Sequence, residues 1–108
     1  MSIVMNLYYF GKNGNARAFA DEMENSGLAD QIRAEEGNER HEYFYPKNDP
    51  ETVLLIDSWR DQAALDFHHE SPMMDRIAEL REKYDLHMSA ERYISGNAPI
   101  SDSRYVRS

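Results

Sequence analysis

The sequence TVLLIDSW, residues 52–59, is the most hydrophobic stretch of the chain and predicts a central strand of a sheet. Side chains alternate between the two faces of a strand, so Asp57 and Trp59 share one face with Val53 and Leu55. Leu54 and Ile56 lie on the other face. Because both faces carry apolar side chains, we expect this strand to be covered on both sides.

Three further segments predict strands around it. The run IVMNLYYF, residues 3–10, places Asn6 on a face with apolar neighbours, where the amide needs a hydrogen-bond partner. HEYFYP, residues 41–46, alternates along its length and leads through the turn KNDPE into the central strand, which predicts a hairpin. LHMSAERYI, residues 86–94, predicts the last strand.

Two helical regions separate these strands. Asn15 is expected to cap a helix whose apolar residues recur at helical spacing up to Met23, and Ser26-Gly27 should interrupt it. Asp61 should cap a short helix, and Ser71-Pro72 predicts a second N-cap with proline at the first helical position. The order strand, helix, strand, strand, helix, strand predicts a ferredoxin-like α+β fold, a four-stranded antiparallel sheet with its helices on one face.

Length and charge limit the function classes. A chain of 108 residues forms one domain, which we expect at residues 1–94, followed by a polar tail at residues 95–108. The formal charge of −8 disfavours nucleic acid and anionic membranes as partners. Neither a signal peptide nor a membrane span is predicted, and the expected location is cytoplasmic. No cysteine is present, which excludes disulfides and thiolate chemistry.

The second face of the predicted sheet needs a cover. Helices on one side leave the other side exposed, although its positions are apolar. Two copies that stack sheet against sheet would bury this surface, so we expect a homodimer, an arrangement known as a dimeric α+β barrel.

The sequence lacks phosphate-cradling, dinucleotide-binding and zincin motifs, and it has no nucleophile elbow. The unusual feature is His68-His69, because adjacent helical residues point about 100° apart and only one of them can face inward. His68 follows the apolar side of its predicted helix. It is either a partly buried structural histidine or a general base whose ordinary pKa suits proton removal at neutral pH.

The candidate site is an aromatic pocket around that imidazole. We expect His68 and Asn6 to act on a ligand in it, and the ligand-binding residues to be Trp59, Tyr43, Asp57 and His41. A few polar groups among aromatic walls are typical of a site for a flat organic molecule. The spacing of the histidines does not require a metal, and we expect none.

The segments EGNERHEYF, residues 36–44, and ETVLLIDSWRDQAALDFHHESP, residues 51–72, resemble the antibiotic biosynthesis monooxygenase family, and the resemblance extends over residues 3–94. It implies a homodimeric ferredoxin-like barrel. As in the quinol monooxygenase-like members, it also implies oxidation of a quinol or an electron-rich polycyclic phenol by O2 without a cofactor. By this resemblance His68 is the base or positions the substrate, Asn6 donates to a substrate oxygen, and Trp59 is a pocket wall with an indole N–H.

Two other functions are compatible with the same residues. EEGN at residues 35–38, and Phe67-His68 before Ser-Pro, are similar to a relative that isomerises a phosphorylated autoinducer, so an isomerase acting on a small carbonyl compound is one alternative. The other is a dimeric binding or stress protein without catalysis, in which His68 is structural.

Overall fold

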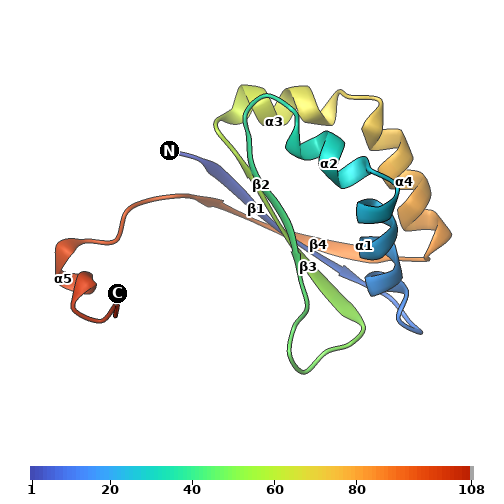
Figure 1. Cartoon of the computed structure of the whole chain (residues 1–108), viewed down its shortest axis with the longest axis horizontal. Coiled ribbons are helices and arrows are strands. Elements are labelled where there is room, and N and C mark those ends of the chain that lie inside the picture. Colours follow the sequence, from blue (N-terminus) through green and yellow to red (C-terminus); the bar gives the residue numbers. More distant parts are fainter. Residues whose placement is uncertain (108) are drawn as a thin grey trace.

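The computed structural model describes residues 1–107, which form a four-stranded antiparallel sheet with helices (Figure 1). The strands are β1 (Ile3–Phe10), β2 (Asn38–Phe44), β3 (Thr52–Trp59) and β4 (His87–Ile94). The helices are α1 (Asn15–Asn25), α2 (Leu28–Arg33), α3 (Gln62–His69), α4 (Met73–Lys83) and α5 (Ile100–Ser103). The strand order β2-β3-β1-β4 is that of a ferredoxin-like fold, as predicted.

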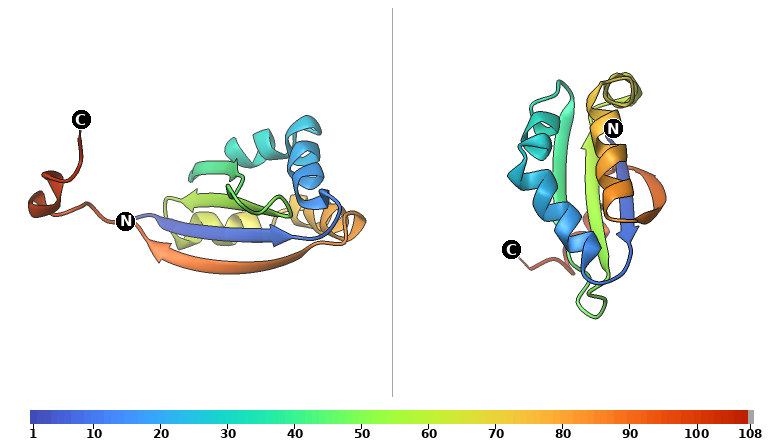
Figure 2. Two further views of the ribbon diagram at one scale, coloured as in Figure 1. Left: turned by 90° about the horizontal axis from the view of Figure 1, so that it is seen from below. Right: turned by 90° about the vertical axis from the view of Figure 1, so that its right-hand side faces the viewer.

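Helices α1 to α4 cover one face of the sheet in two groups, α1 with α2 and α3 with α4 (Figure 2). The strand pairing places Met5 of β1 and His41 of β2 beside Asp57 of β3, so these three side chains lie on the same face. On β3 every residue of that face is buried, whereas on the opposite face Ser58 is buried and the other residues are only partly buried. The core therefore lies between β3 and the helices.

The two inner strands have the predicted bounds, and β2 does not. β2 begins at Asn38 rather than His41 and ends at Phe44 before the predicted Pro46. An irregularity in its pairing with β3 falls between Asn38 and Arg40, where the two strands fall out of step. Charged residues at the start of β2 point to solvent, which hides its strand character from a hydrophobicity pattern.

The start of α1 corrects one expectation. Gly14, with φ 75°, is the N-cap, and Asn15 is the first helical residue. The side-chain amide of Asn15 instead donates to the carbonyl oxygen of Tyr84 at 3.1 Å, which ties α1 to the end of α4. The predicted interruption is confirmed, because α1 ends before Ser26 and Gly27, with φ 85°, precedes α2.

The caps of α3 and α4 are close to those predicted. Oδ1 of Asp61 accepts the backbone N–H of Ala64 at 2.9 Å, as an N-cap does. Oγ of Ser71 accepts the backbone N–H of Met73 at 3.0 Å, while Pro72 precedes the first residue of α4 instead of being it. These caps fix where α3 and α4 begin.

Beyond β4 the chain leaves the sheet. Ser95 still pairs with Ser2, and the following residues extend away from the helices to α5 (Figure 1). The predicted loop-like tail thus contains a short helix, and it carries the exposed apolar residues Ile100, Tyr105 and Val106. Ser108, the last residue of the predicted tail, lies outside the described residues. None of the helices within residues 1–107 is long and apolar enough to cross a membrane.

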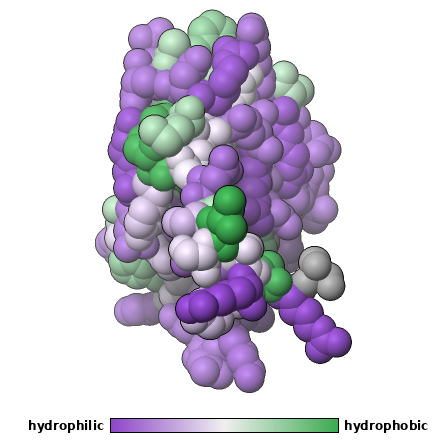
Figure 3. All heavy atoms as spheres, turned by 90° about the vertical axis from the view of Figure 1, so that its left-hand side faces the viewer, coloured by the Kyte–Doolittle hydropathy of each residue, from purple (hydrophilic) through white to green (hydrophobic). Residues whose placement is uncertain are grey.

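No helix among the described residues packs on the second face of the sheet (Figure 2). Figure 3 views the molecule from the side of the tail and shows hydrophobic patches among hydrophilic groups. Phe10 and Tyr93, which belong to this face through their pairing with β4 and β1, are among the exposed large side chains. This open face contrasts with the closed, helix-covered face.

Candidate functional site

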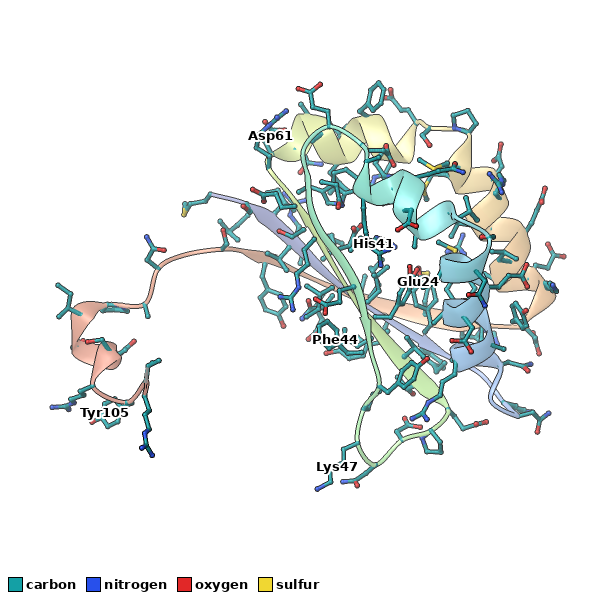
Figure 4. All side chains as sticks on the ribbon, viewed as in Figure 1. Glu24, His41, Phe44, Lys47, Asp61 and Tyr105 are labelled. Atoms are coloured by element: carbon teal, nitrogen blue, oxygen red, sulfur yellow. The ribbon has the colours of Figure 1, made fainter. Side chains whose placement is uncertain are left out.

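A cavity of about 140 Å³ lies between the helix-covered face of the sheet and the helices. Its floor comes from residues of all four strands, among them Leu7, Leu55 and Tyr43, and its roof from α1 to α4. Most of the lining is apolar. In Figure 4, His41 lies on the helix side of β2, whereas Phe44 lies on the other side, as the alternation of the strand requires.

His68 occupies the cavity wall with one ring nitrogen held from behind. Its side chain is buried, at 5% exposure, so the predicted inward orientation is confirmed. Nδ1 lies 2.7 Å from Oε1 of Glu35, which follows α2 in the chain. An ionised carboxylate can only accept, so we assign the proton to Nδ1 of the neutral ring. Nε2 has no hydrogen-bond partner among residues 1–107 and is therefore available as a base.

A second imidazole, His41, belongs to a saturated network. Burial is the main cause that raises the pKa of Tyr43 well above its ordinary 10.0, so this hydroxyl keeps its proton. The hydroxyl donates to Nε2 of His41 at 3.2 Å, and Nδ1 of His41 donates to Oδ1 of Asp57 at 3.0 Å. Both nitrogens of His41 are engaged, so this imidazole cannot accept a proton without breaking a bond.

Asp57 connects this network to the core. Its Oδ2 accepts the indole N–H of Trp59 at 2.9 Å, and its Oδ1 also accepts the side-chain amide of Asn38 at 3.3 Å. With His41, three donors surround one buried carboxylate, which offsets much of the cost of burying the charge. Asp57 therefore stabilises the positions of His41 and Trp59 and has little capacity left for a ligand.

Two predicted site residues stand elsewhere. Asn6 pairs with Ile56 across β1 and β3, on the open face, so the expectation that Asn6 and His68 share one pocket is wrong for the single chain. Its Oδ1 is buried without a partner among the described residues. Trp59 is fully buried behind His68 and does not line the cavity, and its N–H already serves Asp57. The expectation that Trp59 forms a wall of the pocket and donates its N–H to a ligand is therefore wrong, and Trp59 instead supports His68 from behind.

Sequence reasoning missed two side chains of the site. Glu35 looks like its neighbour Glu36, yet its side chain is only 9% exposed and that of Glu36 is 87% exposed. Arg81 of α4 also lines the cavity. The sequence did not single it out, because a basic residue near a helix C-terminus is already explained by its favourable interaction with the helix dipole. The only signal for Glu35 is its place in the EEGN segment, whose Gly37 has φ 85°.

The local chain explains how Glu35 reaches His68. A Cβ at position 37 would collide with the Cβ of Ala64 on α3, so the turn after α2 approaches α3 as closely as glycine allows. Glu35 and His68 lie on the two segments that meet at this contact. Among residues 1–107, no three His, Asp or Glu side chains form a group that could hold a metal.

The arrangement can remove a proton from a hydroxyl in a largely apolar space. Nε2 of His68 is the accepting atom, and the carboxylate of Glu35 stabilises the imidazolium that results. The indole of Trp59 stacks on one face of the imidazole ring of His68 and restricts the rotation of that ring.

Comparison with known proteins identifies the relatives of this chain. The sequence model of a family described as "Antibiotic biosynthesis monooxygenase" matches residues 1–80. The Bacillus subtilis protein "Putative monooxygenase YcnE" is 32% identical over 69 residues, which is 64% of this chain and 70% of that protein.

Solved structures with low sequence identity have the same fold. A structure from Deinococcus radiodurans, titled as a "putative antibiotic biosynthesis monooxygenase", has a TM-score of 0.77 at 14% identity and covers 90% of this chain and 95% of its own. SnoaB from Streptomyces nogalater, described as a cofactor-independent oxygenase, has a TM-score of 0.73 at 11% identity, with coverage of 90% and 95%. At these identities the similarity shows the fold alone.

Proposed function

Because the chain belongs to the antibiotic biosynthesis monooxygenase family, we propose that it is a cofactor-independent monooxygenase that oxidises a quinol or a related electron-rich phenol with O2. The observation that carries this proposal is the state of His68, buried at the cavity with Nδ1 held by Glu35 and Nε2 free. Tyr43, His41 and Asp57 line the same cavity and are proposed to shape it around the substrate.

The proposed reaction begins with the transfer of a quinol proton to Nε2 of His68. The resulting anion is a much better one-electron donor than the neutral quinol, and it reduces O2 to superoxide. Recombination of the two radicals forms a C–O bond on the ring. Loss of water then leaves a hydroxyquinone, so one quinol and one O2 give one hydroxyquinone and one water. The apolar lining excludes water that would compete for the proton.

The test is oxygen uptake with a panel of hydroquinones in metal-free buffer. We expect His68→Ala to lower kcat/KM by about 10²-fold or more, since a positioned base contributes about that factor. The control is His87→Ala, which removes an exposed imidazole from β4, outside the cavity lining. Uptake unchanged by His68→Ala would refute the role of His68. Turnover of a carbonyl substrate under strict anaerobiosis would favour the isomerase, and ligand binding without any turnover would favour a binding protein.

We further propose that residues 1–94 act as a homodimer that stacks the open faces of two sheets. Partly buried apolar side chains such as Val4, Leu54 and Ile56 lie on this face without a cover. The unpartnered Oδ1 of Asn6 is on the same face, where a second copy could supply a donor. Asn6 is thus proposed to act at the interface and not beside His68.

Light scattering with size-exclusion chromatography tests the dimer. Ile56→Asp should give a monomer because it buries a charge in the proposed interface. Phe67→Asp changes an exposed apolar residue on α3 and should leave the dimer intact. A monomeric wild type at micromolar concentration contradicts this proposal.

A further inference from the structure

The cavity contains a cation that the proposed mechanism does not use. Arg81 extends from α4 to the cavity lining, and a guanidinium nitrogen lies 2.9 Å from Sδ of Met88 on β4. A thioether is a weak acceptor and carries no charge. No carboxylate within residues 1–107 forms an ion pair with Arg81, in contrast to Arg33, which pairs with Glu24 and Asp30.

Asp57, the carboxylate of the cavity lining, does not supply the missing charge. Its two oxygens accept three hydrogen bonds from His41, Trp59 and Asn38. Arg81 is partly buried, and keeping its charge without a counterion in a mostly apolar cavity costs free energy. A ligand that carries a negative charge would remove this cost. The ligand group that matches a guanidinium is a carboxylate or another planar anion.

Arg81 and the imidazoles lie toward opposite ends of the cavity. Arg81 contacts Met88, which pairs with Tyr9. His41 is level with Met5, at the other end, and His68 stacks on Trp59, which pairs with Ile3 beyond it. Four residues of a strand separate these two levels, a distance of about 13 Å between Cα atoms. Arg81, His41 and His68 all line the cavity, so a small molecule with a polar group at each end can contact both the guanidinium and an imidazole.

The volume of the cavity limits the size of that molecule. At about 140 Å³ it is comparable with engineered cavities of about 150 Å³, which hold one benzene molecule. A single ring with small substituents fits this space, and fused rings exceed it. The apolar middle of the cavity, with Leu7, Leu55 and Ile77, suits the faces of such a ring.

We propose that Arg81 binds an anionic substituent of the substrate, so that the cavity takes a single aromatic ring with a carboxylate at one end and a phenolic hydroxyl at the other. The phenolic part of this inference rests on the proposed function, whereas the anion site does not. The overall charge of −8 gives an anion no general attraction, so the affinity must come from Arg81 itself.

Calorimetric binding of 2,5-dihydroxybenzoate and of its methyl ester tests this proposal without turnover. Arg81→Met keeps the apolar part of the side chain and should weaken binding of the acid by about tenfold or more, with less than about a twofold effect on the ester. Arg76→Met removes an exposed arginine from the same helix and should change neither affinity. Arg81→Lys, which retains a point charge, should recover part of the lost affinity.

The outcomes separate this proposal from the proposed function. Equal loss of acid and ester in Arg81→Met, or no loss of the acid, overturns the anion site, as does a wild type that binds neither or binds both equally. If hydroquinone still supports oxygen uptake in any of these cases, the proposed function stands. Selective loss of the acid in a protein that never consumes oxygen supports the anion site and overturns the monooxygenase.

Discussion

The imidazole of His68 stacks on the indole of Trp59, with ring centroids 4.7 Å apart and planes 27° apart. Because Trp59 also donates to Asp57, the contact joins the base to the network that holds His41. The stacking opposes rotation of the His68 ring about its bond to Cβ, and the hydrogen bond to Glu35 fixes which nitrogen faces the turn. One aromatic ring thus orients groups from β2, β3 and α3.

Trp59→Phe should destabilise the protein by about 2–4 kcal/mol. The smaller ring leaves a void in the core, and Oδ2 of Asp57 loses a donor to a buried charge. Urea unfolding followed by far-ultraviolet circular dichroism measures the loss, since the chain has a single tryptophan and its fluorescence disappears. A cycle with Asp57→Asn should show coupling between the two positions, and additive effects would contradict the assigned bond.

The strands were the most predictable part of the structure. β3 has the expected bounds, and every residue of its helix-side face is buried, as the alternation predicts. The inward position of His68 follows from its spacing after Leu65. Whether Asn6 and His68 lie near each other depends on whether Asn6 or its neighbour Met5 shares a face with Asp57. The pairing of β1 with β3 decides this, and the alternation within one strand does not predict how two strands that are far apart in the sequence pair.

Glu35 was not predictable for a different reason. It lies in a turn, where no periodicity distinguishes an inward residue from an outward one, and Glu36 beside it is identical in chemistry. Its burial depends on the close approach of the turn to α3. The partner of a catalytic residue can therefore come from a segment that looks like a solvated loop.

That close approach predicts a large effect of Gly37→Ala. The new Cβ would collide with Ala64, and φ of 85° is unfavourable for alanine, so we expect a loss of about 2–4 kcal/mol in unfolding free energy. Gly14→Ala is the matched control, because φ is 75° but the added Cβ meets nothing within 4 Å. It should cost only the conformational part, about 1–2 kcal/mol. Equal losses in the two variants would mean that the turn does not press on α3.

Alkaline pH should destabilise the protein through Tyr9. Burial, the largest cause, raises the pKa of its hydroxyl from 10.0 to about 12, and the charge of Arg81 partly opposes this. The folded state therefore retains a proton that the unfolded state releases, so the stabilisation is complete below pH 10 and is lost as pH rises toward 12. For two pKa units this is at most about 3 kcal/mol.

Unfolding free energies measured across this pH window give the test. Tyr9→Phe, which has no proton to release, should show a shallower decline than the wild type. Tyr105→Phe alters an exposed tyrosine in the tail and should leave the steep decline in place. A wild type and a Tyr9→Phe variant with parallel declines would show that the hydroxyl of Tyr9 titrates normally.

Glu35→Gln should lower kcat while leaving KM nearly unchanged. The amide oxygen of glutamine can still accept from Nδ1 of His68, so the ring keeps its orientation, but the negative charge that stabilises the imidazolium is gone. We expect kcat in oxygen uptake to fall by about 10²-fold. Glu36→Gln, one residue further along the same turn and almost fully exposed, should behave as the wild type. A rise in KM at constant kcat would assign Glu35 to substrate binding, and a loss of stability without a fall in kcat would make it a purely structural partner of His68.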